Sequence, residues 1–293
     1  MGMLKVGARV VGSMLDLLKG PFPMTVRIET TNHCNAACTF CPRESIGRPK
    51  GFMSEDLFRK IVDECATEGT SVLHLHNFGE PLMDKQLPER IAYAKTKGIA
   101  RVKIYCNGAF LKGKMAEGLI QSGLDEIKIS IDGADADEFN RLRIGLNHET
   151  VLDHVRAFRE LRDRISVTQL TTIIAACSQT TNREQTKAML VDVVDRIDFA
   201  KLHNWAGSKS WLLGEKQVRK PCDRLWRTFT ILVNGDVALC CLDYSGKEIL
   251  GNVAKQTIRS IWNNARYREL RERHRKSQQD QIELCRNCSK SYL

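Results

Sequence analysis

The chain has 293 residues and a formal net charge of +10, and 11 of its residues are cysteine. This length suits one large domain or two smaller ones, and no apolar run approaches the roughly 20 residues that a membrane-spanning helix needs. Residues 1–19 contain no signal-peptide cleavage site, so we expect a soluble protein of the reducing cytoplasm, where clustered cysteines serve metal binding or catalysis rather than disulfides.

The first predicted element is a short amphipathic helix over 3–18, which ends at the Gly20-Pro21 pair. We expect this helix to pack on the outside of the main domain. An apolar strand is predicted next, over 25–29.

Three cysteines stand in the loop after this strand, at spacings of four and three residues: Cys34, Cys38 and Cys41. Thiolates this close in sequence can bind one small inorganic core. An iron–sulfur cube takes four cysteine ligands, so a three-cysteine loop would leave one iron open to another molecule, much as catalytic zinc sites keep one position open. A zinc site or a group of unliganded thiols is the alternative interpretation.

Strands and helices alternate after the cysteine loop. The predicted strands cover 71–76, 102–106, 126–131, 167–175 and 198–203, and the predicted helices cover 54–68, 87–97, 112–122, 149–164 and 182–194. Together with the first strand, this pattern implies parallel pairing through right-handed crossovers. The predicted fold class is α/β with a partial (β/α)6 barrel, because a complete eight-unit barrel needs about 250 residues.

Polar residues recur where these predicted strands end, which is the edge at which barrels of this type place active sites. The residues at these ends are Gly79, Glu80, Asn107, Ser130, Asp132, His203 and Trp205, and Arg143 follows shortly after Asp132. Ser130 and Asp132 alternate onto one strand face, which we expect to be the barrel interior. His74 and His76 alternate with apolar residues in the same way, so both are expected to point into the barrel. A histidine such as His203 at the rim can donate to substrate or act as acid or base.

The Cys-x3-Cys-x2-Cys loop after a first strand resembles the signature of the radical S-adenosylmethionine (radical SAM) superfamily. Three further segments are similar to motifs of that family: Gly79-Glu80-Pro81, Asn107-Gly108 and Ser130-Ile131-Asp132-Gly133. The resemblance implies a [4Fe–4S] cluster on Cys34, Cys38 and Cys41. In that family the open iron binds S-adenosylmethionine, and the reduced cluster cleaves it to a 5′-deoxyadenosyl radical that takes hydrogen from substrate.

The same resemblance implies roles for individual residues. Glu80 would hold the methionine amino group, Arg143 would pair with the methionine carboxylate through its planar fork, and Asn107 would lie near the adenosyl group or substrate. The implied cofactor-binding residues are Phe40, Gly79, Glu80, Ser130, Asp132 and Arg143.

A second cysteine set follows residue 216, where the composition changes. A hairpin is predicted over 228–241 around Asn234 and Gly235, followed by helices over 257–262 and 264–276. Cysteines from a loop, the hairpin and a terminal Cys-x2-Cys pair would form a closed site, which could hold zinc through tetrahedral thiolates or an iron–sulfur cluster. The candidates are Cys222, Cys240, Cys241, Cys285 and Cys288.

The densest positive charge lies on the last of these predicted helices. No recognised nucleic-acid-binding module or interleaved aromatic stripe accompanies this charge, so we interpret it as a solvated helix face and expect no nucleic-acid partner. The residues concerned are Arg266, Arg268, Arg271, Arg273, Arg275 and Lys276.

The C-terminal segments resemble the shortened SPASM domain, or twitch domain, of radical SAM enzymes. This resemblance implies one auxiliary [4Fe–4S] cluster on Cys222, Cys240, Cys285 and Cys288, with Cys240 rather than Cys241 in the ligand position. The predicted organisation is an N-terminal helix and linker over 1–24, a radical SAM core over 25–215 and a twitch domain over 216–293. The remaining Cys65, Cys106 and Cys177 are expected to be buried thiols.

Four ligands would saturate the auxiliary cluster, so the resemblance favours electron transfer, as in the radical SAM aminocyclitol dehydrogenases. It implies oxidation of an alcohol to a ketone in a sugar- or aminocyclitol-like small molecule, with a flavodoxin or ferredoxin as reductant. The candidate catalytic residues are His203, Asn107 and Trp205, and Trp205 stands where those dehydrogenases place an arginine. The alternatives are a maturase of ribosomal peptides (thioether or epimerase chemistry), a redox-neutral sugar epimerase or dehydratase, and a non-catalytic electron carrier.

Overall fold

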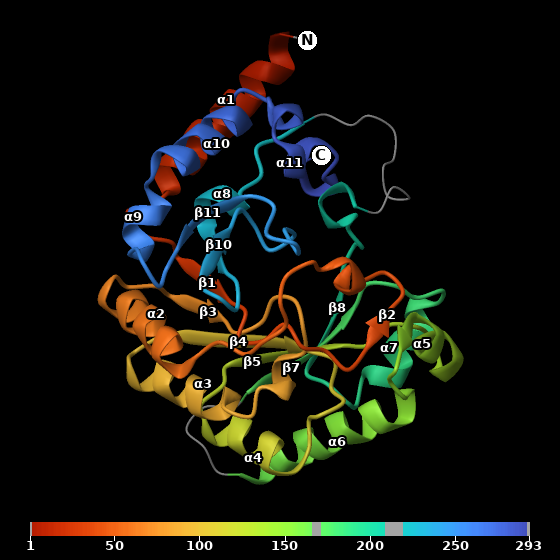
Figure 1. Ribbon diagram of the computed structural model, residues 1–293. Coiled ribbons are helices and arrows are strands. Elements are labelled where there is room, and N and C mark those ends of the chain that lie inside the picture. The colour runs from red at the N-terminus through yellow and green to blue at the C-terminus, as the bar shows by residue number, and fades with distance from the viewer. Residues whose placement is uncertain (1, 166–170, 209–218, 292–293) are drawn as a thin grey trace.

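The computed structural model describes residues 2–165, 171–208 and 219–291. One large sheet dominates this part of the chain (Figure 1). Its strands are β1 (Thr25–Ile28), β3 (Val72–His74), β4 (Arg101–Cys106), β5 (Glu126–Ser130), β7 (Thr172–Cys177), β8 (Arg196–Phe199), β9 (Thr228–Ile231), β10 (Asp236–Ala238) and β11 (Ile249–Asn252). They are ordered β11-β10-β9-β1-β3-β4-β5-β7-β8 across the sheet.

The half of the sheet from β1 to β8 is the predicted partial barrel. Each neighbouring pair in this half is parallel, and helices connect the strands and cover one face of the sheet (Figure 1). These helices are α2 (Glu55–Thr67), α3 (Leu87–Thr96), α4 (Gly113–Gln121), α5 (Ala136–Leu142), α6 (His148–Arg164) and α7 (Arg183–Leu190). The predicted α/β class with a partial barrel is therefore confirmed.

Polar side chains determine where several of these helices begin. Ser54, Asn147 and Asn182 each accept a hydrogen bond from a backbone N–H group in the first turn of α2, α6 and α7. These N–H groups have no partner within the helix itself, so a capping side chain stabilises each helix start.

The two faces of the barrel strands differ in chemistry. The helix-facing residues are apolar and buried, such as Val26, Leu73, Ile104 and Ile127. The residues between them face the concave side, because successive side chains of a strand point to opposite faces. These residues are largely polar and mostly half-buried: Arg27, His74, Lys103, Tyr105 and Lys128. Parallel strands are normally apolar on both faces, so the polar concave face marks this interior as a binding region rather than a second core.

The C-terminal hairpin extends the same sheet. β9 pairs in parallel with β1, and β10 and β11 follow as antiparallel strands. The boundary predicted between residues 215 and 216 lies outside the described residues. Four helices complete this region: α8 (Arg224–Arg227), α9 (Ile258–Trp262), α10 (Ala265–Arg275) and α11 (Glu283–Arg286). The hairpin is thus joined to the barrel by backbone hydrogen bonds.

The N-terminal helix α1 (Gly2–Leu18) lies beside α10 (Figure 1), so the expectation that it packs on the barrel was wrong. Asp16 accepts hydrogen bonds from Trp226 Nε1 and Arg275 Nη1, both at 2.6 Å. A Cβ added at Gly12 would lie 2.5 Å from Cγ of Arg275, so this glycine lets the two helices approach closely. An amphipathic pattern predicts an apolar stripe but not the surface that covers it.

The charged face predicted for α10 is only partly solvated. Arg271 is 4% exposed, and its guanidinium donates to the carbonyl oxygens of Leu225 and Trp262. It also lies over the rings of Trp262 and Tyr267, at 4.3 and 4.5 Å. The expectation of a uniformly solvated face was therefore wrong at Arg271, because carbonyl oxygens and aromatic rings replace its water.

Short elements account for the other differences from prediction. The two-stranded sheet of β2 (Ala37–Cys38) and β6 (Arg143–Ile144), together with α5 and β11, was not predicted. The predicted strand over 167–175 begins in 166–170, outside the described residues, and β7 ends two residues later, at Cys177. No helix in the described ranges has the length and apolar character of a membrane span.

Candidate functional site

The cysteine loop lies at the carboxyl end of β1. Cys34, Cys38 and Cys41 are half-buried. Burial raises the pKa of Cys34, and it raises the pKa of Cys41 to about 11, with further increases from the charges of the neighbouring sulfurs. These thiols therefore lie within electrostatic range of one another and would have to release protons to a metal core. Within the described ranges, no three metal-binding side chains converge as they would on a single ion, whereas a cube binds each cysteine at a different iron.

Arg143 connects this loop to the end of β5. The pairing of β2 with β6 sets Arg143 opposite Cys38, and its Nη1 lies 3.6 Å from the sulfur of Cys38. Its guanidinium lies 5.3 Å from the ring centroid of Phe40. Nε donates to Oδ2 of Asp132 at 2.9 Å. In this structure, the arginine predicted for the methionine carboxylate is therefore paired with another predicted cofactor residue, Asp132.

Glu80 is a buried carboxyl group at the end of the β3 segment, with 2% of its surface exposed. Its oxygens accept from the backbone N–H groups of Leu82, at 3.0 Å, and Asn107, at 2.6 Å. Burial raises the pKa of Glu80 to about 7, although these two hydrogen bonds act to lower it. No cation in the described part of the chain forms an ion pair with it. A buried carboxylate in this state suits an ammonium group as its partner.

Gly79 and Asn107 hold Glu80 in place. Gly79 has φ +97, and a Cβ there would lie 2.6 Å from the carbonyl oxygen of Thr31 and 2.8 Å from that of His33. The backbone N–H of Glu80 donates to the same His33 oxygen at 2.7 Å. The side-chain amide of Asn107 donates to Asn35 of the cysteine loop at 2.9 Å. Asn107, predicted near the reacting groups, thus ties β4 to the cysteine loop.

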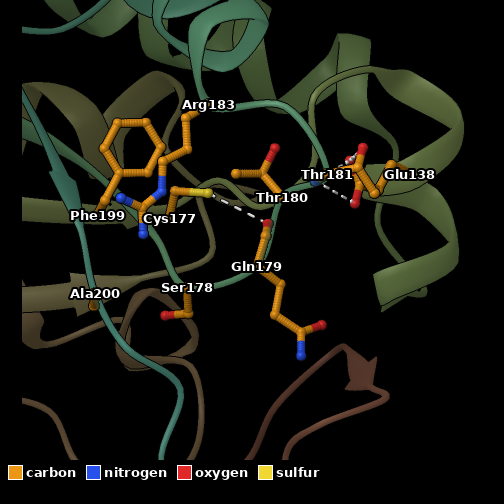
Figure 2. Close-up of a pocket in the computed structure, with 9 residues that line it drawn as sticks. All are labelled: Glu138, Cys177, Ser178, Gln179, Thr180, Thr181, Arg183, Phe199 and Ala200. Carbon is orange, nitrogen blue, oxygen red and sulfur yellow. Dashed lines mark hydrogen bonds between the residues drawn. The ribbon is translucent and has the colours of Figure 1, made fainter.

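A cavity opens beyond Asp132, at the ends of β7 and β8 (Figure 2). Asp132 Oδ1 accepts from the backbone N–H groups of Ser178 and Gln179, at 2.5 and 2.8 Å. Arg183 lies over the ring of Phe199, 5.1 Å from its centroid, and Figure 2 shows these two side chains together on one side of the cavity. The opposite side is formed by Thr181 and Glu138, which are joined by a 3.0 Å hydrogen bond.

Sequence analysis did not assign these cavity residues. Phe199 ends β8, and the segment 178–181 follows β7, so both stand at the carboxyl edge of the sheet. The rule that active sites lie at that edge would have pointed to both. Cys177 also lines the cavity, and the structure confirms that Cys65, Cys106 and Cys177 are buried.

The second cysteine set lines a single cavity in the C-terminal region. Cys222, Cys240, Cys285 and Cys288 all contribute to its walls. Burial raises the pKa of Cys222 to about 11 and also raises the pKa of Cys240. Four thiols around one cavity fit a cluster that takes four cysteine ligands. Cys241 is not among the lining residues, and its sulfur accepts a 2.8 Å hydrogen bond from Arg224.

His274 also lines this cavity, and sequence analysis missed it. Its Nδ1 accepts from the backbone N–H of Cys222 at 3.2 Å, and its Nε2 is buried with no partner in the described structure. Burial lowers the pKa of His274 to about 4, so the ring is neutral. The residue stands within the charged helix α10, and only the packing of α10 on α8 brings it to the cysteines.

The segment 203–205 lies between the two cysteine sites. Trp205 Nε1 donates to the carbonyl oxygen of Phe40 in the first loop, at 2.6 Å. Asn204 donates to the carbonyl oxygen of Asn287 at 2.6 Å and accepts from the N–H of Ser289 at 2.9 Å. Asn287 and Ser289 flank Cys288 in the sequence. His203 and Trp205, both predicted as catalytic, therefore stand where the two sites meet.

His203 packs edge-on against Trp205, with 4.3 Å between the ring centroids. Its Nδ1 is buried and has no hydrogen-bond partner within the described ranges. Burial, followed by the nearby charges of Arg224 and Lys290, lowers the pKa of His203 to about 4. A neutral imidazole with an unpaired ring nitrogen is able to accept a proton from a bound group.

Family comparisons agree with this two-site arrangement. Residues 28–190, more than half of the chain, match the sequence model of the radical SAM superfamily, and residues 222–289 match that of the SPASM iron–sulfur cluster-binding domain. The S-adenosyl-L-methionine-dependent 2-deoxy-scyllo-inosamine dehydrogenase of Niallia circulans is 22% identical over 268 residues, which cover 90% of this chain and 92% of that one. A probable GTP 3′,8-cyclase of Methanococcus maripaludis is 33% identical over 126 residues, 43% of this chain and 42% of the cyclase.

Solved structures share the fold. The crystal structure of BtrN in complex with AdoMet and 2-DOIA matches with a TM-score of 0.66 and 21% identity, covering 91% of this chain and 92% of that chain. Streptococcus suis SuiB bound to its precursor peptide SuiA matches with a TM-score of 0.71 and 14% identity, covering 89% of this chain and 69% of SuiB. At these identities the likeness establishes the fold alone.

Proposed function

Because this chain belongs to the radical SAM superfamily, we propose that it oxidises a hydroxyl group of a sugar- or aminocyclitol-like small molecule to a ketone. It is a radical SAM enzyme, whose cofactors are S-adenosylmethionine and a [4Fe–4S] cluster. Its SPASM domain implies an auxiliary iron–sulfur cluster. The observation that carries the proposal is the cavity lined by Cys222, Cys240, Cys285 and Cys288. An electron acceptor with four protein ligands, placed next to the first site, is what an oxidation requires.

The residues of the first site divide the work of binding. Cys34, Cys38 and Cys41 would hold the first cluster, with Phe40 packed beside it. Glu80 would accept the methionine ammonium group, since it is a buried carboxyl with no ion-pair partner among the described residues. Asp132 holds Arg143 and the 178–179 backbone in place. Ser130 stands two residues earlier, on the same face of the strand. Asn107 positions Glu80 through its backbone N–H.

The cavity beyond Asp132 would take the adenosyl end. Phe199 and Arg183 offer a flat apolar and cationic wall for a purine ring, and Thr181 and Glu138 offer polar atoms at the opposite side. The 178–179 backbone forms part of this wall and is fixed by Asp132.

When bound, the cofactors supply a 5′-deoxyadenosyl radical that takes the hydrogen atom from the alcohol carbon and an auxiliary cluster that takes one electron. The hydroxyl proton must also leave for a ketone to form. His203 would accept it through Nδ1, which has no partner in the described structure, and bound substrate would have to offset the burial that lowers the pKa of this ring to about 4. Trp205 fixes His203 against the first cysteine loop through its bond to Phe40.

The electron that reduces the first cluster would come from a flavodoxin- or ferredoxin-type protein in the cytoplasm. This part of the proposal rests on the family and on the cysteine content of the chain, which suits a reducing compartment.

The test is an anaerobic reaction of the reconstituted, reduced enzyme with 2-deoxy-scyllo-inosamine and with neutral, phosphorylated and carboxylated polyols, each carrying deuterium on its alcohol carbons. The proposal expects deuterium in 5′-deoxyadenosine and one equivalent of ketone. A redox-neutral epimerase or dehydratase would give an isomer or a dehydrated product without net oxidation. An electron carrier would give no substrate-dependent 5′-deoxyadenosine.

A further inference from the structure

Cations and imidazoles crowd the concave face of the barrel. Three carboxylates along its strands are already paired: Glu29 accepts from Arg48 at 2.7 Å, Glu126 accepts from Lys103 at 3.1 Å, and Asp198 accepts from Lys128 at 2.6 Å. Arg101 and Arg196, at the ends of β4 and β8, contact Glu126 and Asp198 as well. Positive charge therefore exceeds negative charge on this face before any ligand binds.

Arg27, on β1, has no carboxylate partner among the described residues. In the described part of the chain it forms no ion pair, and its Nη2 donates to Nδ1 of His74 at 3.1 Å. Its Nε is buried with no partner. Burial lowers the pKa of His74 to about 2, so this neighbour is neutral and brings no charge of its own. A guanidinium that has no carboxylate partner and whose Nε is buried without a hydrogen-bond partner is costly unless a ligand completes the pair.

Two other buried polar atoms near Arg27 also have no partner in the described structure. Thr230 on β9 pairs in register with Arg27, and its Oγ1 is unsatisfied. His76 stacks on His74, with 5.3 Å between ring centroids, and its Nδ1 is unsatisfied. Buried polar groups are almost always hydrogen-bonded. One unsatisfied atom of Arg27 and two on the neighbouring Thr230 and His76 therefore leave this place with bonds that a ligand could make.

We propose that Arg27 and Thr230 form an anion subsite for the substrate, so that the substrate is a hydroxylated small molecule carrying a carboxylate or phosphate group. This inference rests on the proposed function, and it narrows the sugar- or aminocyclitol-like class to anionic members. The guanidinium fork pairs well with either group, and the Thr230 hydroxyl supplies another donor. An ammonium group on the substrate would instead add a cation to a face that already has an excess.

The location favours a substrate role. Thr230 pairs with Ala238 of β10, two residues before Cys240, so the subsite adjoins the auxiliary site. At the other end of the same face, the ring centroids of His76 and Tyr105 are 5.8 Å apart, and the Tyr105 side chain interacts with the side chain of Ser130. A molecule held at Arg27 would thus extend from the auxiliary cysteines toward the end of β5, where Asp132 follows.

Arg27 has one competing role. The anionic groups that act on its pKa are the sulfurs of Cys241 and Cys240, so its charge could serve the auxiliary cluster instead of a substrate. The two roles give different results when Arg27 is neutralised. Loss of an anion subsite weakens anion binding, whereas loss of a counter-charge shifts the reduction potential of the auxiliary cluster.

The experiment is anaerobic calorimetric titration of the reconstituted holoenzyme, without reductant, using inorganic phosphate and, separately, glycolate. We expect saturable binding of at least one anion, and the one that binds more tightly identifies phosphate or carboxylate as the group. Arg27→Gln should weaken that binding by about ten- to a hundredfold. Arg141→Gln removes an exposed arginine of α5 and should leave it unchanged.

Two further variants guard against misfolding. Thr230→Val removes a hydroxyl that has no partner among the described residues, so it should fold normally and weaken anion binding severalfold. Arg27→Lys keeps the charge without the fork and should retain part of the affinity. The proposal is overturned if neither anion binds saturably, or if Arg27→Gln and Arg141→Gln have equal effects. A shifted auxiliary-cluster potential with unchanged anion binding would assign Arg27 to the cluster.

These titrations need no turnover, so they are independent of the oxidation assay. An enzyme that binds the anion through Arg27 but forms no ketone would contradict the proposed oxidation and leave the subsite standing. An enzyme that forms ketone but whose anion binding is unchanged by the Arg27 substitutions would support the proposed oxidation and contradict the subsite.

Discussion

Glu80 shows how burial prepares a single side chain for a charged ligand. Two backbone N–H groups hold its carboxyl oxygens, yet burial keeps its pKa near 7. An ammonium group would replace the missing cation and stabilise the ionised form. The binding of S-adenosylmethionine should therefore depend on the charge of this residue.

Glu80→Gln should weaken the binding of S-adenosylmethionine by about ten- to a hundredfold, since a charge-assisted hydrogen bond contributes roughly 1.5–3 kcal/mol. The wild-type affinity should also fall as the pH drops below about 7, because the carboxyl then gains a proton, and the variant should lack this dependence. Titration followed by the EPR signal of the reduced cluster measures both. Glu117→Gln, an exposed position on α4, is the control, and equal affinities would remove Glu80 from the site.

Gly79 is a steric requirement of the same segment. In Gly79→Ala the new Cβ would lie 2.6 Å from a backbone oxygen, at φ +97, so the segment would have to move away from the cysteine loop. We expect loss of S-adenosylmethionine binding with the auxiliary iron retained, measured by titration and iron analysis. Gly47→Ala, where nothing lies within 4 Å of the added Cβ, should behave like wild type. Normal binding by Gly79→Ala would show that the loop tolerates displacement.

At the scale of elements, the C-terminal helices complete the site rather than merely covering the barrel. The α11 region supplies Cys285 and is followed by Cys288, and Asn204 ties this region to the rim beside Trp205. The packing of α10 brings His274 to the same cavity. The cysteine pair is therefore linked to the proposed catalytic residues through Asn204.

The Cys285→Ala, Cys288→Ala double variant tests the role of this region. We expect S-adenosylmethionine cleavage to continue while ketone formation is largely lost. The amount of 5′-deoxyadenosine formed should therefore exceed the amount of ketone. The control is iron analysis, which should find about four irons at the first site, together with circular dichroism, because loss of a metal site can unfold a domain. A folded double variant that oxidises substrate at the parental rate would leave the second cluster a purely structural role.

The contact between α1 and the C-terminal region is a second element-scale feature. Asp16→Ala removes the acceptor for Trp226 and Arg275, which should cost about 1–2 kcal/mol and lower the Tm by roughly 2–8 °C. Circular dichroism of the reconstituted protein measures this change. Asp153→Ala breaks an exposed pair within α6 and should change the Tm little. Equal Tm values for the two variants would contradict the importance of this contact.

At the scale of the whole molecule, one continuous sheet joins both cysteine sites. β1 leads into the first cysteine loop and also pairs with β9, whose partner β10 leads to Cys240. The polar concave face lies between them. This arrangement attaches both cysteine sites to one sheet, and the proposed substrate-binding face lies between them.

The iron content tests this arrangement directly. The anaerobically reconstituted protein should bind about eight irons, as two cubes of four, and the Cys34/Cys38/Cys41→Ala triple variant should retain about half. Iron and sulfide analysis with EPR of the reduced protein measures both. Four irons in the wild type, or zinc in the C-terminal site, would contradict the two-cluster assignment.

Local sequence patterns were sufficient to predict the alternation of strands and helices, the placement of three cysteines in one loop after β1, and the position of polar residues near the strand ends. Each of these follows from residues close together in the chain. A period of two or of 3.6 residues specifies a strand or a helix, and three cysteines within eight residues must share one loop.

Long-range packing decided the rest. Sequence spacing does not indicate that Arg143 pairs with Asp132, that α1 lies on α10, or that His274 reaches the second cysteine cavity. Such contacts depend on which apolar surfaces cover one another, and many surfaces of similar pattern compete for the same partner. Arg27 is the clearest case: in sequence it is one charged residue in a short strand. Only its position against His74 and Thr230 leaves it with an unsatisfied Nε and no carboxylate partner among the described residues, because the charge balance of a site depends on neighbours contributed by separate strands.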